Sequence, residues 1–179
     1  MSFEESLSLP NDWESTTVGH LVETGVLAKP LDGNHGGIHP KSSDYVEHGI
    51  PFIMASDLQG GQVDLTMCKF ISEAQARNLR KGFAQAGDVL LSHKATIGRT
   101  ALVQDSEYPF LMLTPQVTYY RVIDYGKIIP GYLKAYFDSN FFQSVLAQWA
   151  GAGSTRAYLG ITGQLNLPVI VPPIEFQRL

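Results

Sequence analysis

Cysteine and long apolar runs are scarce in this chain of 179 residues. Because Cys68 is its only cysteine, no internal disulfide can form, which excludes a small fold held by disulfides and favours a reducing cytoplasm. No apolar run approaches the roughly 18 residues of a membrane-spanning helix, so we expect no membrane partner. The first residues, MSFEESLSLPNDW, are acidic and lack an apolar stretch, which argues against a signal peptide.

The sequence also lacks the common motifs of catalytic sites. HExxH, CxxC, GxSxG and the phosphate-loop consensus GxxxxGKS/T are absent, and GAGSTR at 151–156 follows a predicted helix and has no lysine. Ser92 and His93 are neighbours in a predicted strand, so their side chains point to opposite faces and cannot form a nucleophile–base pair. We therefore expect no enzyme, although a hydrolase that uses a histidine stays open because triads assemble in space.

A metal site at His35 and His39, with Asp32, is the one metal hypothesis that the sequence raises. Two histidines four residues apart ligate one ion most readily from a helix. Gly36, Gly37 and Pro40 surround them and preclude a helix there, so we expect no metal.

Composition and pattern favour one folded domain. Apolar residues make up 44% and charged residues 17% of the chain, which is enough to form a core and excludes intrinsic disorder. Strands and helices alternate irregularly, which predicts the α+β (mixed α/β) class. Turn, cap and periodicity signals predict a helix at 18–22 capped by Thr17, a helix from Ser72 to a C-cap at Gly82, a helix at 130–149, and strands at 51–55, 89–92, 100–103, 111–122 and 165–171.

Charge is unevenly distributed along the chain. The net charge of −4 argues mildly against nucleic acid. Residues 1–66 carry ten acidic and two basic side chains, whereas residues 67–99 carry two acidic and six basic ones. The middle third could thus present a basic face on an acidic body, although an ordinary solvated helix and turn would give the same pattern.

Several segments, in order along the chain, together resemble the target recognition domain of the specificity subunits of Type I restriction-modification systems. They are LPNDW (9–13), GIPFIMASDLQGG (49–61), GDVLLSHKATIGRTALV (87–103), PQVTYYRV (115–122), GSTRAYLGIT (153–162) and LPVIVPPIEFQ (167–177), and DGNHGGIHPK (32–41) is similar to one subset of the family. One departure is Phe176, which separates Glu175 from Gln177, where the family usually has Glu-Gln directly after the double proline.

The resemblance implies a single compact domain of the target-recognition type, with a twisted, mainly antiparallel sheet and a few helices. It implies a recognition domain at 1–171 and the start of a conserved spacer helix at 172–179, truncated, where the family's subunits usually carry two such domains. The implied role is to recognise one half of a bipartite double-stranded DNA target, without catalysis. S-adenosylmethionine and ATP are then cofactors only of the partner subunits, the modification (methyltransferase) subunits and the restriction (motor and endonuclease) subunit.

Polar loops supply the candidate DNA contacts. Lys, Arg, Ser, Thr and Asn side chains bind phosphates and base edges. The hairpin loop at 93–99, the glycine-rich loop at 32–42 and the loop after the long helix supply His93, Lys94, Thr96, Arg99, Asn34, His35, Lys41, Ser154, Thr155 and Arg156.

The alternative is a protein-interaction or regulatory module that shares this fold without touching DNA. The acidic first third of the chain favours it. A basic cleft formed jointly by residues 32–42, 93–99 and 154–158 would favour DNA.

Overall fold

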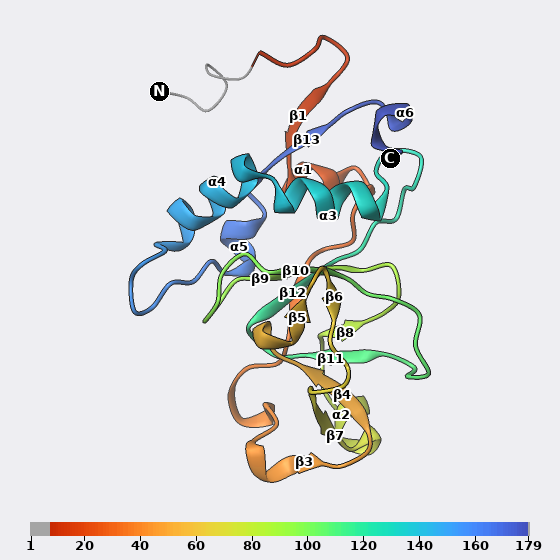
Figure 1. Ribbon diagram of the computed structural model, residues 1–179, viewed down its shortest axis with the longest axis vertical. Coiled ribbons are helices and arrows are strands. Elements are labelled where there is room, and N and C mark those ends of the chain that lie inside the picture. Colours follow the sequence, from red (N-terminus) through yellow and green to blue (C-terminus); the bar gives the residue numbers. More distant parts are fainter. Residues whose placement is uncertain (1–7, 179) are drawn as a thin grey trace.

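Two multi-stranded sheets organise the computed structural model, which describes residues 8–178 (Figure 1). The strands are β1 (Glu14–Thr17), β2 (Leu31–Asp32), β3 (Tyr45–Val46), β4 (Ile50–Ile53), β5 (Leu58–Gln59), β6 (Gln62–Val63), β7 (Lys69–Ile71), β8 (Phe83–Ala84), β9 (Val89–Ser92), β10 (Thr100–Leu102), β11 (Leu111–Leu113), β12 (Val117–Tyr120) and β13 (Pro168–Val171). The expected α+β class is confirmed.

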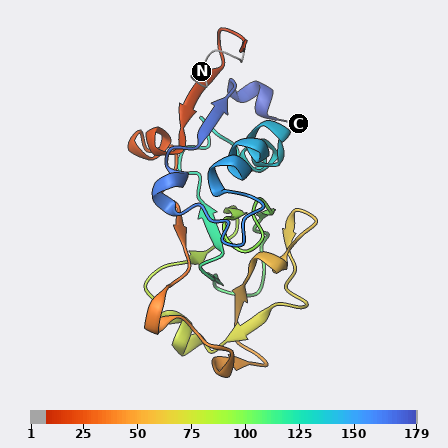
Figure 2. The ribbon, with the colours of Figure 1, turned by 90° about the vertical axis from the view of Figure 1, so that its left-hand side faces the viewer.

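The helices lie mostly in the half of the molecule that holds both ends of the described chain. They are α1 (Val18–Glu23), α2 (Glu73–Arg77), α3 (Pro130–Asp138), α4 (Asn140–Ala150), α5 (Ile161–Gln164) and α6 (Ile174–Gln177), with short 3-10 helices η2 (Gly36–Ile38), η3 (Ser42–Asp44) and η4 (Ala55–Asp57). Figure 2 shows the same division after a 90° turn, with only the short α2 and the 3-10 helices in the other half. No helix among residues 8–178 is long and apolar enough to cross a membrane.

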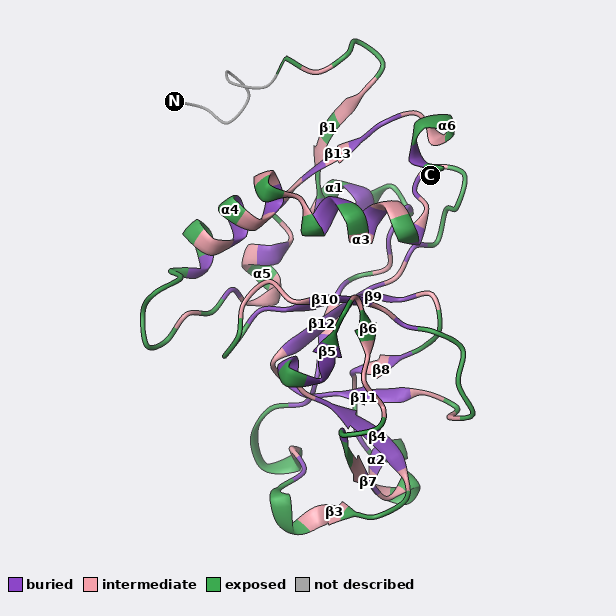
Figure 3. Cartoon of the chain, in the orientation of Figure 1, coloured by how far each residue is buried: buried purple, intermediate pink, exposed green. Residues whose placement is uncertain are grey.

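The four-stranded sheet lies between two apolar layers. Its order is β10-β9-β12-β2, and every neighbouring pair is antiparallel. All residues of β9 and β12 are buried, as the purple strands of Figure 3 show. Because side chains alternate along a strand, Val89 and Leu91 pack with the helices while Leu90 packs with the second sheet. This two-sided burial explains why both strands are almost continuously apolar.

The five-stranded sheet forms the other half, in the order β3-β7-β4-β11-β8. Only β11 and β4 pair in parallel within it. Phe52, Ile71 and Met112 join Ala76 of α2 in a small apolar cluster there. The two-stranded pairs β1-β13 and β5-β6 complete the described sheets, so antiparallel pairing dominates as expected.

Tyrosine and glutamine side chains fasten the C-terminal end of the described chain to α3 and to the segment before it. Tyr132 and Tyr136 of α3 donate hydroxyl hydrogen bonds to the carbonyl oxygens of Ile170 and Pro168, at 2.5 and 2.6 Å. Gln177 of α6 is buried, accepts the Ile129 N–H at 2.9 Å, and donates to the carbonyl oxygens of Lys127 and Pro172.

The local start signals were predicted correctly. Thr17 caps α1 by accepting the His20 N–H at 3.2 Å, and Ser72 caps α2 by accepting the Gln75 N–H at 3.2 Å. The hairpin of β9 and β10 is also confirmed.

Three predictions of local structure were wrong. The strand at 111–122 is divided, because Pro115 has no N–H and a turn from Thr114 to Val117 moves the chain from one sheet to the other. The helix at 130–149 is divided at Ser139, whose extended backbone and side-chain oxygen cap α4. Helix α2 ends at Arg77 with Asn78 as its C-cap, well before Gly82.

Candidate functional site

Three segments far apart in the sequence meet around one open hollow. It has a volume of about 550 Å³ and is lined by His35 from the glycine-rich stretch, Lys94 and Ala95 from the hairpin loop, and residues 154–158 from the loop after α4. In Figure 1 the hairpin loop and the loop after α4 project at the same edge of the molecule. The structure therefore brings together His35, Lys94, Ser154, Thr155 and Arg156, five of the side chains that the sequence predicted as DNA contacts.

Backbone pairing joins the hairpin loop to the loop after α4. Lys94 and Tyr158 form an isolated antiparallel bridge, and Leu159 donates its N–H to the carbonyl oxygen of His93 at 3.1 Å. The rings of His93 and Tyr158 lie 5.7 Å apart. The two loops therefore form one continuous surface.

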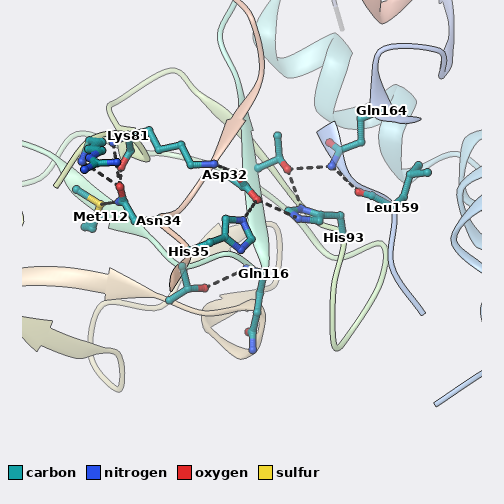
Figure 4. Close-up of polar contacts among 12 residues, drawn as sticks. Asp32, Asn34, His35, Lys81, His93, Met112, Gln116, Leu159 and Gln164 are labelled. Carbon is teal, nitrogen blue, oxygen red and sulfur yellow. Dashed lines mark hydrogen bonds and ion pairs between the residues drawn. The ribbon is translucent and has the colours of Figure 1, made fainter. Parts of the chain in front are cut away.

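A buried polar network lies beneath this surface (Figure 4). The side chains of His93, Thr118 and Gln164 are fully buried. Gln164 donates from Nε2 to the Thr118 hydroxyl oxygen at 3.1 Å and to the Leu159 carbonyl oxygen at 2.8 Å, and it accepts the Tyr120 hydroxyl at 2.6 Å. Thr118 Oγ1 lies 2.7 Å from Nδ1 of His93. Each of these polar side chains thus has a hydrogen-bond partner in the protein interior, where an unpaired polar group is costly.

Asp32 links this network to the rim of the hollow. Its carboxylate, only 2% exposed, accepts hydrogen bonds from Nε2 of His35 at 2.8 Å and from the Lys81 ammonium, and it lies 3.7 Å from Nε2 of His93. Burial acts to raise the pKa of Asp32, but the hydrogen bonds from Lys81 and His35 outweigh it, so the pKa falls below its ordinary value. The carboxylate is therefore charged and holds His35 in place.

Burial lowers the pKa of His93 to about 4, although the charge of Asp32 acts in the opposite direction. The imidazole is therefore neutral near pH 7. Nδ1 of His93 shares a hydrogen bond with the Thr118 hydroxyl, whose oxygen also accepts the Gln164 amide N–H. Nε2 faces the Asp32 carboxylate at 3.7 Å and has no hydrogen-bond partner among the described residues.

Burial corrects two of the expected contacts, Asn34 and His93. Asn34 is 2% exposed; it donates to the Lys81 carbonyl oxygen at 2.8 Å and accepts the N–H groups of Arg80 and Lys81. The Asn34 side chain thus joins the glycine-rich stretch to the turn after α2. His93 is fully buried in the network described above. Neither side chain offers an atom to a ligand in this conformation, because both have turned inward to satisfy buried polar groups.

The remaining predicted contacts lie outside the hollow. Thr96 is exposed at the hairpin loop, and Lys41 is exposed before η3. Arg99 is half-buried: its N–H donates to the Ser92 hydroxyl oxygen at 2.9 Å, and its buried Nη1 has no hydrogen-bond partner among the described residues.

The histidines do not assemble a familiar catalytic or metal centre. The Thr118 hydroxyl does bond to His93, but both side chains are fully buried, so no substrate reaches them. The ring of His39 lies against Phe52, with centroids 5.7 Å apart, while His35 bonds to Asp32. Within residues 8–178, no group of three His, Cys, Asp or Glu side chains could hold a metal ion.

Local charge at the hollow differs from the net charge of the chain. Lys94 and Arg156 line it, and none of its lining side chains is acidic. Asp32, the carboxylate beneath it, is neutralised by the Lys81 ammonium. The acidic residues of the first third thus contribute no side chain to the lining of the hollow.

Asp32, Lys81, Thr118 and Gln164 were not predicted to belong to this site, apart from Asp32 in the rejected metal hypothesis. Gln164 and Thr118 lie 46 residues apart, and Lys81 and Asp32 lie 49 apart. No spacing within the chain points to such pairs. Only the short interval between Asp32 and His35 carries a local signal.

Comparisons with known proteins agree with the sequence resemblance. The chain is 25% identical over 171 residues to the Type I restriction enzyme EcoBI specificity subunit of Escherichia coli. The aligned residues make up 95% of this chain and 34% of that protein. The chain resembles a type I specificity subunit. It spans about a third of the length of this curated relative. No protein-family model matches the chain.

Solved structures of type I specificity subunits share the fold. The TM-score is 0.67 to the HsdS subunit from Thermoanaerobacter tengcongensis, with 21% identity over 97% of this chain and 37% of that one. It is 0.70 to a chain from a structure on complex assembly and conformational transition of the type I R-M system, with 21% identity over 98% of this chain and 38% of that one. For the Type-I S subunit from M. genitalium it is 0.60, with 11% identity over 96% and 38% of the two chains. The expected target-recognition-type fold is confirmed.

Proposed function

We propose that this chain recognises double-stranded DNA, reading one half of a bipartite target as the specificity component of a type I restriction-modification complex. The observation that carries the proposal is the convergence of the three polar loops on one hollow without an acidic side chain. A basic cleft formed jointly by these loops was the feature expected to favour DNA over an interaction module, and a hollow that Lys94 and Arg156 line supports the DNA-binding choice. The similarity to the EcoBI specificity subunit supports the same role.

The exposed side chains suit the two kinds of DNA contact. Lys94, Arg156, Ser154 and Thr155 supply the donors that phosphate oxygens accept. The loop between β9 and β10 extends beyond the four-stranded sheet, so its side chains, and not the buried strands, would enter the major groove, which is about 12 Å wide. Lys94, Thr96 and Arg99 would then be the side chains nearest to base edges.

The chain itself would supply recognition and no catalysis. Modification subunits that carry S-adenosylmethionine would methylate the DNA, and a restriction subunit would use ATP for translocation and cleavage. Residues 1–171 would form the recognition domain and residues 172–179 would begin a spacer helix. Few cations line the hollow, so DNA binding by the chain alone would be weak and sensitive to salt.

Selection from random duplexes at low salt tests the proposal. The unmodified chain should enrich a motif of about three to five base pairs, and the double variant Lys94→Ala/Arg156→Ala should lose it. Arg178→Ala is the matched control: this exposed cation lies after α6, beside Ile129 and Tyr132.

Salt-dependent binding without an enriched motif calls for the same selection with the methyltransferase subunits added. If no motif appears then either, or if the chain binds no duplex at low salt, DNA recognition is ruled out and the interaction module takes its place.

A further inference from the structure

We propose that His93 is a positioning residue whose fixed ring orientation holds the three loops of the hollow as one rigid surface, and that this rigidity sets the selectivity of DNA reading. The DNA part of this inference rests on the proposed function. The positioning part concerns the protein alone and is measured without DNA.

The backbone of His93 lies between two of the segments that need to be joined. Its N–H donates to the Gln116 carbonyl oxygen at 2.9 Å, which fixes it to the start of β12. Its carbonyl oxygen accepts the Leu159 N–H at 3.1 Å, which fixes it to the loop after α4. A movement of His93 therefore moves Lys94 and Tyr158, its bridged neighbours, across the hollow.

The side chain of His93 reaches the third segment through Asp32. Nε2 faces the Asp32 carboxylate at 3.7 Å, and that carboxylate holds His35 at the rim. A neutral imidazole has one N–H, and only the form with the proton on Nε2 turns a positive edge toward the charge. The same ring flipped, or protonated on Nδ1, would present a lone pair to Asp32.

With the proton of His93 on Nε2, Nδ1 is a bare acceptor, and the Thr118 hydroxyl, 2.7 Å away, is the donor that completes this form of the ring. The Thr118 oxygen in turn accepts the Gln164 amide at 3.1 Å, and the same amide donates to the Leu159 carbonyl oxygen. Donation thus runs from Gln164 through Thr118 to His93, and Gln164 also connects Thr118 to the loop after α4.

Rigidity matters here because the hollow is built from loops. Ordering a loop when a ligand binds costs free energy, and a base contact needs closer alignment than a phosphate contact. A looser surface would therefore lose selectivity among sequences while keeping its salt-dependent attraction to the duplex.

Replacing Thr118 by valine or by serine tests the inference with a matched pair. Thr118→Val keeps the branched shape in β12 and removes the hydroxyl, whereas Thr118→Ser keeps the hydroxyl. Nitrogen NMR on the unmodified protein near pH 7 should show Nε2 of His93 protonated and Nδ1 bare. This measurement needs no variant, so it holds even if Thr118→Val fails to fold.

Amide hydrogen exchange measures the loop directly. In Thr118→Val the Leu159 N–H should exchange about fivefold faster or more, while the Leu133 N–H inside α3 keeps its rate. Thr118→Ser should exchange like the unmodified protein. A proton on Nδ1, or an unchanged Leu159 rate in Thr118→Val, would overturn the positioning role.

Selection from random duplexes then separates this inference from the proposed function on which it rests. Thr118→Val should select its preferred bases less strongly than the unmodified chain does, while the salt dependence of DNA binding stays unchanged. A loosened loop with an unchanged motif would show that rigidity does not set selectivity. If the unmodified chain selects no motif, the proposed function fails, and exchange at Leu159 still decides the positioning role.

Discussion

Arg121 holds the carboxylate of Asp88 with two hydrogen bonds, each 2.8 Å long, from Nε and Nη2. Asp88 is 1% exposed and also accepts the Gln85 N–H at 2.9 Å. Nη2 of Arg121 donates in addition to the Phe83 carbonyl oxygen at 3.0 Å, and the guanidinium stacks 4.5 Å above the Tyr119 ring. One side chain thus fastens the end of β12 to the turn before β9 and to β8, a strand of the other sheet.

Loss of this clamp should lower stability strongly. Arg121→Ala leaves Asp88 buried without its charge partner, and we expect the free energy of unfolding to fall by about 2–4 kcal/mol. Arg77→Ala is the control: Arg77 pairs with Glu73 at the surface, each 56% exposed, and lies 5.3 Å over the Phe110 ring, so its loss should change the free energy of unfolding by no more than about 1 kcal/mol. Urea denaturation measures both, and equal losses would contradict the account.

Gly33 is required because two segments of the backbone approach each other closely there. A Cβ at Gly33 would lie 2.0 Å from the Leu113 carbonyl oxygen and 2.4 Å from the Thr114 carbonyl carbon. Both are backbone atoms that cannot move aside, so Gly33→Ala should destabilise the protein by several kcal/mol, on the order of 3 or more.

Gly37 provides the matched control for this substitution. A Cβ there meets nothing within 4 Å. Gly37→Ala should therefore leave the thermal midpoint within a few degrees of the unmodified protein. A comparable midpoint for both alanine variants would contradict the close approach at Gly33.

Stability should depend on pH through His93. Burial lowers its pKa to about 4, against 6.5 in the unfolded chain, so the unfolded state takes up the proton first as pH falls. The contribution of neutral His93 is complete above pH 6.5 and is lost as the pH falls through 4, with a slope of up to about 1.4 kcal/mol per pH unit.

Denaturant titrations between pH 7 and 4.5 measure this slope. His93→Gln should reduce the slope in that interval, whatever its effect at pH 7. His48→Gln, at a side chain 91% exposed, should leave the slope as it is. An identical slope in all three proteins would assign the pH dependence to other groups.

Arg99 offers a test of how the DNA is read. Arg99→Ala should weaken binding to a selected duplex by about 1–3 kcal/mol and relax one base position if the guanidinium reads a guanine. If Arg99 contacts phosphate alone, Arg99→Ala should weaken binding to all duplexes equally. The slope of the logarithm of the binding constant against the logarithm of the salt concentration should then fall in magnitude by about one. Arg99→Lys keeps the charge and removes the paired donors, so it separates the two cases. Unchanged affinity in Arg99→Ala would remove it from the interface.

Local features of the fold followed from the sequence because their causes lie within a few residues. Thr17 and Ser72 cap helices through N–H groups three residues away, and the apolar strands around 93–99 pair as a hairpin. The ordered family segments likewise predicted the recognition-type fold, and the three loops that line the hollow were named from their polar residues.

Tertiary structure alone decided which polar side chains face the solvent and which form hydrogen bonds in the interior. Asn34 and His93 share the polarity of their exposed neighbours, and nothing in their local sequence marks them as buried. Their partners lie far along the chain: Asn34 meets Lys81, and His93 meets Thr118. Burial creates the demand for these hydrogen bonds, and burial depends on how the sheets pack. Composition and local pattern determined what the loops contain, whereas packing determined which of their side chains stay exposed.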